Sequence, residues 1–165
     1  MVLKRQMRTV ATLLRRFPWI VALARIGWRL RQPKFTAGAV GVIFDDAGRV
    51  LLVEHVFHPY APWGLPGGWV DRREDPRDTV QRELHEELGA AVQVGPVLAV
   101  ELGFGNHLDM AYLCSLDGGI NQISRELLGY AWRSVDDLPK LQSFHLLAID
   151  RALTVTQGKF QQRSS

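Results

Sequence analysis

The chain changes its hydrophobic period at Pro33, from a helical spacing before it to a mixture of strand and helix patterns after it. Apolar residues four and three positions apart predict an amphipathic helix over residues 2–17, and a second helical segment is expected over residues 19–30 after Pro18. The organisation expected from this change is an N-terminal basic helical extension over 1–34, a domain over 35–158 and a polar C-terminal tail over 159–165.

The domain begins with strand patterns. Residues 35–44 are small, apolar and β-branched, which is typical of a buried strand. Residues 50–56 are the expected hairpin partner across a turn at Asp45–Gly48. Further strands are expected at 69–70, 92–102, 109–116 and 128–132, with a short helical turn over 135–138 and a final helix over 142–156. This order of strands and helices predicts a mixed α/β domain.

A helix expected over residues 76–88 has clear ends. Asp75 suits the N-cap, Pro76 suits the first helical position, and Gly89 suits the residue just after the helix. Its apolar stripe repeats every four residues: Val80, Leu84 and Leu88. The helix should therefore bury one face against the sheet.

Three glutamates lie beside that stripe: Glu83, Glu86 and Glu87. Residues three or four apart on a helix are neighbours, so these carboxylates are expected to converge. Like charges at close range raise each other's pKa or require a cation between them. A hard divalent cation such as Mg²⁺ takes oxygen ligands and also binds substrate phosphates. The alternative is a solvated acidic helix face.

Composition and charge change this picture in two ways. The single cysteine, Cys114, lies in an apolar run, so we expect a buried free thiol in a reducing, cytoplasmic compartment. The net charge of +3 is unevenly distributed, because residues 1–34 contain nine basic residues and no acidic one. The remaining chain has eleven basic and seventeen acidic residues, a net charge of −6. The basic pI therefore describes the N-terminal segment and argues little for nucleic-acid binding by the whole chain.

The basic segment has three alternative roles. It packs against the domain or a partner subunit in a homo-oligomer, it contacts an anionic membrane surface or steers substrate, or it is a targeting sequence. Its longest uncharged run, residues 17–24, is too short to span a bilayer, which takes about 20 residues.

The segment from Gly68 to Ala90 resembles the signature box of the Nudix hydrolases (MutT-like proteins), G-x5-E-x7-R-E-U-x-E-E-x-G-U with U aliphatic. The matching positions are Gly68, Glu74, Arg82, Glu83, Leu84, Glu86, Glu87 and Gly89. Ala90 is smaller than usual at the last position, and Arg73 stands where glycine is frequent. The resemblance covers residues 35 to about 153 and leaves the basic segment outside.

The resemblance implies an α/β/α sandwich with a mixed sheet, in which the box forms a loop, a helix and a loop. It also implies Mg²⁺, with Mn²⁺ able to substitute, as the cofactor. The implied metal ligands are Glu83, Glu86, Glu87 and the carbonyl of Gly67, with Glu74 and Glu126 as secondary candidates. The implied catalytic residues are Glu83, Arg82 and Glu86, with Glu83 as the expected general base and Arg82 orienting it.

The implied reaction is hydrolysis of a pyrophosphate bond in a nucleoside diphosphate linked to another group X, which gives a nucleoside monophosphate and phospho-X. Hydrolysis of nucleoside triphosphates, of RNA 5′ ends, or binding of nucleotides without turnover are the alternatives. Proline or tyrosine markers that distinguish some subfamilies are absent about sixteen residues after the box. No substrate-binding residue is assigned, and His107 and Asp109 form no recognisable ligand spacing.

Overall fold

The computed structural model describes the backbone of residues 14–57 and 60–163, and the side chains of these residues up to Thr156. The chain forms two compact units, residues 1–34 and 35–165. In the first unit, α2 (Pro18–Arg31) begins with a proline and ends with Arg29 and Arg31 in its last turn. The helix expected over residues 2–17 lies mostly outside the described residues. Among the described helices, none combines the length and apolar character that a membrane crossing requires.

The second unit is built from two sheets. The four-stranded sheet has the order β4-β1-β6-β5, and the three-stranded sheet has the order β3-β2-β7. β1 pairs in parallel with β6 and antiparallel with β4, so the larger sheet is mixed. The strands are β1 (Thr36–Ile43), β2 (Val50–His55), β3 (Trp63–Gly64), β4 (Gly67–Trp69), β5 (Ala91–Leu102), β6 (His107–Asp117) and β7 (Leu127–Arg133).

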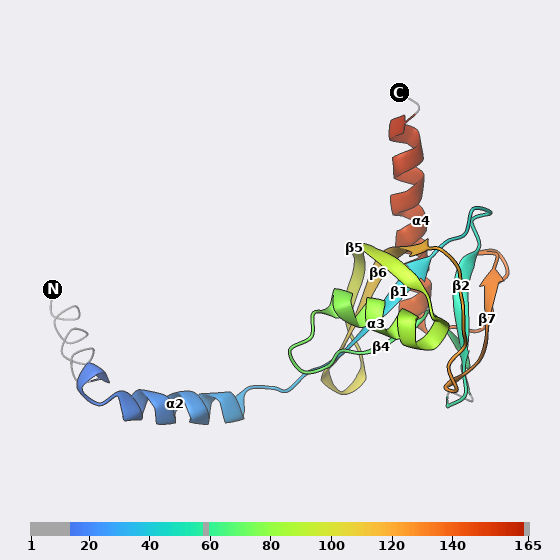
Figure 1. Ribbon diagram of the computed structural model, residues 1–165. Helices are drawn as coiled ribbons and strands as arrows, with labels where there is room; N and C mark the ends of the chain where they lie inside the picture. The colour runs from blue at the N-terminus through green and yellow to red at the C-terminus, as the bar shows by residue number, and fades with distance from the viewer. Residues whose placement is uncertain (1–13, 58–59, 164–165) are drawn as a thin grey trace. The chain divides into compact units, whose positions relative to one another are not determined.

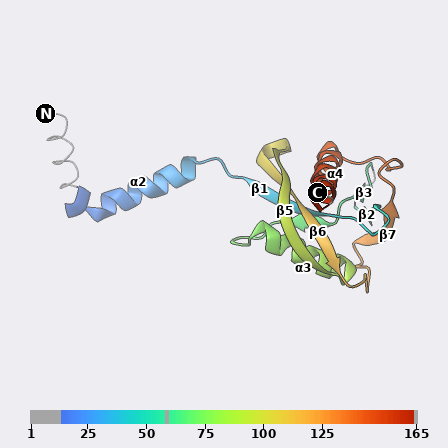
Figure 2. The ribbon, with the colours of Figure 1, turned by 90° about the horizontal axis from the view of Figure 1, so that it is seen from above.

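The helices cover the two faces of β1. Ala39 and Ile43 of this strand face α3 (Pro76–Leu88), whereas Val40 and Val42 pack with α4 (Ser143–Arg163). In Figures 1 and 2, α3 and α4 lie on opposite sides of β1. Because successive residues of a strand point to opposite faces, one buried strand supplies both hydrophobic cores. The expected α/β fold with helices on either side of a mixed sheet is confirmed.

The expected hairpin between residues 35–44 and 50–56 is wrong. The two segments share a single bridge, Phe44 to Val50, and then separate into different sheets. The Asp45 carboxylate accepts hydrogen bonds from the backbone amides of Ala47 and Arg49, at 3.0 and 2.8 Å, which forms the tight turn. β6 pairs with β1 along its whole length and β4 pairs with its other edge at Gly38–Val40, while β2 pairs with β7.

Two further elements differ from expectation. Residues 135–138 form a turn rather than a helical segment, in which the amide of Asp137 donates to the Ser134 carbonyl. The last helix continues to Arg163 instead of ending near Thr156. Between β5 and β6 the chain forms a short 3₁₀ helix, Phe104–Asn106.

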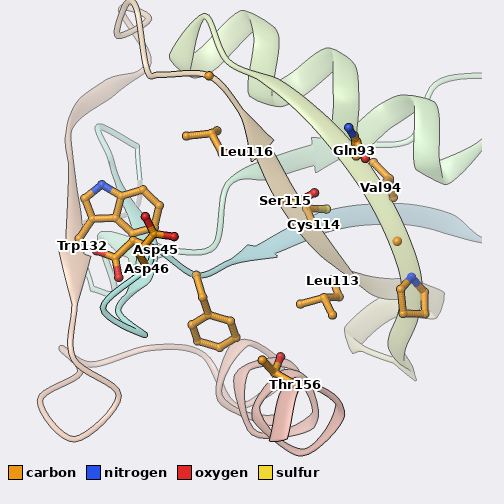
Figure 3. A pocket seen from close by; sticks show the side chains of 14 residues that line it. Asp45, Asp46, Gln93, Val94, Leu113, Cys114, Ser115, Leu116, Trp132 and Thr156 are labelled. Atoms are coloured by element: carbon orange, nitrogen blue, oxygen red, sulfur yellow. The ribbon is translucent and has the colours of Figure 1, made fainter. Parts of the chain in front are cut away.

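The two ends of the paired strands β1 and β6 lie next to different cavities. Thr36 pairs with His107 at one end and Ile43 pairs with Cys114 at the other. The cavity at the Cys114 end, about 650 Å³, has a mixed lining that includes apolar residues such as Leu113 and Trp132 and polar ones such as Asp45 and Gln93 (Figure 3). Burial raises the pKa of the Cys114 thiol to about 12, so it stays protonated at neutral pH. None of the box glutamates lines this cavity.

Candidate active site

The Gly67–Gly68 segment is held against β1. Gly67 pairs with Val40, Gly68 pairs with Ala39, and the amide of Gly41 donates to the Pro66 carbonyl at 2.9 Å. Gly67 has φ +143°, and a Cβ atom there would collide with the Ala39 carbonyl oxygen. Glycine alone fits this conformation and this spacing. The loop backbone can therefore lie flat beside the strand, close to α3.

The helix α3 is capped as the sequence predicts. The Asp75 carboxylate accepts a hydrogen bond from the amide of Arg77 at 2.9 Å, and Pro76 occupies the first turn. Gly89 ends the helix in the left-handed region, with φ +58°, and its amide donates to the His85 carbonyl at 2.9 Å. Val80, Leu84 and Leu88 are fully buried. These caps and this stripe determine which way the glutamates of α3 point.

Glu87 is the most buried carboxylate of the site, with 7% of its surface exposed. The amide of Gly67 donates to its Oε2 atom at 3.3 Å, which ties the helix to the glycine loop. Burial raises the pKa of Glu87 to about 8, and this single hydrogen bond offsets the effect only in part. The negative charges of Glu83 and Glu126 raise the pKa further. A buried carboxylate with so little compensation favours either a proton or a cation.

Arg82 connects the helix to the loop before it. Its Nε and Nη2 atoms donate to the two carboxylate oxygens of Glu74 at 2.8 and 3.0 Å, and Nη2 also donates to the Trp69 carbonyl at 3.1 Å. The Arg82 hydrogen bonds, followed by those from the Asp71 amide and the Thr79 hydroxyl, lower the pKa of Glu74 to about 2. The same contacts raise the pKa of Arg82. Glu74 therefore stays ionised and anchors the guanidinium.

The third guanidinium nitrogen of Arg82, Nη1, donates a hydrogen bond to the Oε1 atom of Glu83 at 2.7 Å. This carboxylate lies over Gly68, where a Cβ atom would collide with it. Burial raises the pKa of Glu83, and Arg82 opposes the rise. Glu86 differs, because 59% of its side chain is exposed and its contact with Arg82 is longer, at 3.4 Å.

A cavity of about 330 Å³ brings these groups together. The residues lining it are His55, Phe57, Gly67, Gly68, Trp69, Asp71, Arg82, Glu83, Glu87 and Glu126. Of the residues predicted for the site, Glu86 and Glu74 are not in its lining; Glu74 supports it through Arg82. Glu126 is distant in sequence, and its carbonyl accepts a hydrogen bond from the amide of Val56 at 3.0 Å. The fold therefore adds a third carboxylate to the two from α3.

The composition of this cavity fits a hard divalent cation. Three carboxylates repel one another in a partly buried space, and the pKa values of Glu83 and Glu87 are raised. A divalent cation relieves this repulsion and prefers oxygen ligands. In the part of the chain that the structure describes, no three acidic, histidine or cysteine side chains are already arranged around a single point as ligands. Glu83 is instead bonded to Arg82, and Glu87 to the Gly67 amide.

A sequence model of the NUDIX domain matches residues 34–152. The chain belongs to this family. A MutT-like protein of Streptomyces ambofaciens is 27% identical over 107 residues, which cover 64% of this chain and 68% of that protein. Human nucleoside diphosphate-linked moiety X motif 6 is 31% identical over 116 residues, covering 64% of this chain but 36% of the human protein. The crystal structure of a MutT NUDIX hydrolase from Burkholderia pseudomallei, 30% identical, superposes with a TM-score of 0.63, covering 72% of this chain and 98% of that one.

Membership of the family makes the chain a pyrophosphohydrolase that acts on a nucleotide-type substrate. Nudix hydrolases generally use divalent metals, in agreement with the acidic cavity.

Sequence patterns did not reveal a second group of polar residues next to this cavity. His107 and Asp109 lie on β6, and Trp69 lies on β4; β1 pairs with both strands and so brings the three together. The ring centroids of Trp69 and His107 are 4.6 Å apart. No fixed sequence spacing marks this group, because it depends on strand order. His58, another residue of the loop before the box, lies outside the described residues.

Proposed function

We propose that the chain hydrolyses a pyrophosphate bond in a nucleoside diphosphate linked to another group X, releasing a nucleoside monophosphate and phospho-X, with Mg²⁺ as cofactor and Mn²⁺ able to replace it. The observation that carries this proposal is the single cavity lined by Glu83, Glu87 and Glu126 beside the Arg82 guanidinium. The human relative, whose name refers to nucleoside diphosphate-linked moieties, supports the choice of substrate class.

The cation would be held by Glu83, Glu87 and the Gly67 carbonyl, with Glu126 as a further ligand or base and Glu86 at the outer edge. When bound, it neutralises the pyrophosphate oxygens and lowers the pKa of an attached water. Glu83 is the proposed general base. In the proposed step, a water oxygen would form a new bond to phosphorus while its proton moves to the Glu83 carboxylate, and the bridging P–O bond would break with its electron pair on the leaving phosphate oxygen.

Arg82 supports this step by fixing the position of Glu83. Its bidentate contact with Glu74 and its bond to the Trp69 carbonyl orient the Nη1 atom that reaches Glu83. A planar guanidinium held on several sides has little freedom to rotate, so the base keeps one orientation. Loss of the Glu74 contact should therefore slow turnover without removing a group that touches substrate.

The decisive experiment is a substrate screen with Mg²⁺ and Mn²⁺ in which the products are identified. The proposal expects nucleoside monophosphate from diphosphate-linked compounds. Glu83→Gln and Glu87→Gln should each reduce kcat by at least about 100-fold while the fold is kept. Glu101→Gln, an exposed glutamate on β5, is the matched control and should keep full activity. Nucleotide binding without turnover on the whole panel would refute the enzymatic proposal.

Release of pyrophosphate from nucleoside triphosphates or from RNA 5′ ends is the second candidate. An RNA pyrophosphohydrolase of Dinoroseobacter shibae is 40% identical over 58 residues, which cover 35% of this chain. The nine basic residues of the segment 1–34 could engage a phosphate backbone. RNA hydrolysis that falls steeply with salt and is lost on deletion of 1–34 would favour this candidate.

The same deletion addresses the other roles of the basic segment. A changed oligomeric state would indicate contact with a partner subunit, and lost binding to anionic vesicles would indicate contact with a membrane surface. Unchanged nucleotide hydrolysis in either case would place the segment outside the catalytic reaction.

A further inference from the structure

A second cavity of about 550 Å³ opens directly beside the carboxylate cavity. The two share four lining residues, His55, Gly67, Gly68 and Trp69. A substrate whose pyrophosphate lies at the carboxylates can therefore extend directly into the second cavity. At 550 Å³ the space suits a nucleoside, since small-molecule sites span about 300–1,000 Å³.

Trp69 lies at the junction and offers a flat apolar surface. Its ring contacts that of His107, with centroids 4.6 Å apart and planes tilted by 58°. Its backbone carbonyl accepts a hydrogen bond from Arg82. Despite these contacts, 64% of the residue is exposed. An indole that is held in place and still exposed provides a surface for stacking a planar ring.

Among the described residues that line this cavity, Asp109 is the one carboxylate, alongside polar side chains such as Thr36 and Gln142. The Nε2 atom of His107 lies 3.4 Å from its Oδ1 atom, and the Nδ1 atom of His107 lies 2.8 Å from the Thr36 hydroxyl. The two ring nitrogens of His107 thus face the Thr36 hydroxyl on one side and the Asp109 carboxylate on the other, which places the imidazole beside the carboxylate. An ionised carboxylate offers only hydrogen-bond acceptors.

Two glycines leave the space that this arrangement needs. A Cβ atom on Gly38 would lie 2.9 Å from His107 Nε2, and one on Gly103 would lie 2.6 Å from Asp109 Oδ2. Side chains at either position would displace the imidazole or the carboxylate. Among the described residues, His107 is the one ion-pair contact of Asp109. A carboxylate has about four lone-pair directions, so Asp109 can accept from two more donors.

We propose that this cavity, which we call the Asp109 pocket (Trp69, His107 and Asp109), binds the nucleoside part of the substrate and selects it by a pair of adjacent hydrogen-bond donors. Two parts of a nucleoside present such a pair: the N1–H and N2–H₂ edge of guanine, and the vicinal hydroxyls of ribose. Asp109 is the specificity-determining residue, whereas His107 and Thr36 position it. The inference rests on the proposed function, which places the pyrophosphate at the neighbouring carboxylates.

Calorimetric titration of the full chain with nucleoside monophosphates, in the presence of Mg²⁺, distinguishes the two donor pairs. Inosine monophosphate lacks the N2 amino group of guanosine monophosphate, and the 2′,3′-dideoxy form lacks both ribose hydroxyls. A hydrogen bond to a charged acceptor is a strong one, so loss of the relevant donor should weaken binding at least about 10-fold. Weaker binding of the inosine compound identifies the base edge; weaker binding of the dideoxy compound identifies the ribose.

Asp109→Asn should remove that difference, because one of the two acceptor oxygens becomes a donor. Asp117→Asn, at the exposed end of the same strand, is the matched control and should preserve it. Thr36→Val should reduce the difference, and Thr36→Ser should restore it, which a purely structural role of Thr36 would not predict. Undetectable binding of guanosine monophosphate, equal binding of all three compounds, or a difference that survives Asp109→Asn would overturn the proposal.

The two proposals fail in different ways. If the carboxylate cavity is not catalytic, the wild type shows no turnover on the panel, yet selective binding that depends on Asp109 persists. If the Asp109 pocket is wrong, the wild type turns substrates over, and Asp109→Asn leaves its ranking of nucleotides unchanged.

Discussion

Replacement of Glu87 by glutamine should make the metal-free protein more stable at alkaline pH while it abolishes turnover. Burial raises the pKa of Glu87 in the folded protein to about 8, from an ordinary value of 4.5. Between these values the folded protein holds a proton that the unfolded chain has released. The free energy of unfolding therefore decreases as the pH rises from about 4.5 to 8, and this penalty is complete above pH 8.

The size of the penalty follows from the difference between the two pKa values, about 8 against 4.5. Each pKa unit corresponds to about 1.4 kcal/mol, which sets an upper limit of about 5 kcal/mol. Water entering the adjacent cavity reduces the cost of the charge, so we expect about 2–4 kcal/mol between pH 5 and pH 9. Glutamine is neutral throughout and its carbonyl oxygen can still accept from the Gly67 amide. The variant should therefore lack this decrease.

The assay is urea unfolding followed by circular dichroism at pH 5, 6.5, 8 and 9, with a chelator and at constant ionic strength. Glu101→Gln serves as the control for removing a negative charge from the surface. Addition of Mg²⁺ at pH 8 should then stabilise the wild type more than Glu87→Gln, because the cation compensates the carboxylate. Parallel pH curves for the wild type and Glu87→Gln would refute the assignment of a strained, buried charge to this position.

Three other predictions concern the geometry around Glu83 and the loop before α3. A Cβ atom at position 68 would collide with the Glu83 carboxylate, so Gly68→Ala should displace it and lower kcat about 100-fold with an unchanged circular dichroism spectrum. Near-normal kinetics would show that Glu83 does not act from this position. Arg82→Lys replaces a planar fork with a point charge, so kcat should fall about 10- to 100-fold with little change in KM; a change confined to KM would contradict the positioning role. Arg73 has φ +70°, a backbone conformation that is unfavourable for a residue with a side chain. Arg73→Gly should therefore leave the free energy of unfolding within about 0.5 kcal/mol or raise it, whereas Arg72→Gly should lower it by about 0.5–1 kcal/mol. Equal losses for the two variants in thermal or urea unfolding would contradict this reasoning.

Local chemistry made the bounds of α3 predictable. The N-cap at Asp75, the proline after it and the left-handed Gly89 act within a few residues, so the bounds of α3 follow from neighbouring positions. The regular spacing of Glu83 and Glu87 beside the apolar stripe likewise follows from the helical period. Each of these features depends on residues that lie close together in the sequence.

Strand pairing was much harder to predict from the sequence. The prediction that residues 35–44 pair with residues 50–56 assumed that neighbours in sequence form a hairpin, and it was wrong. The partners of β1 are instead β4 and β6, and β6 is so distant in sequence that no local pattern identifies it. The Asp109 pocket depends on this parallel register, so its residues could not be grouped beforehand. Even the exposure of Glu86, which differs from the burial of Glu87, depends on where the loop and the sheet lie.

The position of β1 also has a consequence for how the domain folds. Its antiparallel contact with β4 joins residues about 30 positions apart, whereas its contact with β6 joins Thr36 to His107, 71 positions apart. Since the entropy cost of closing a loop grows with its length, the shorter contact should form first and the parallel pair later. The glycine loop of the active site would thus be laid against β1 early, before the strand that carries Asp109 arrives. During synthesis, the glycine loop would then meet its supporting strand before the residues of β6 have emerged.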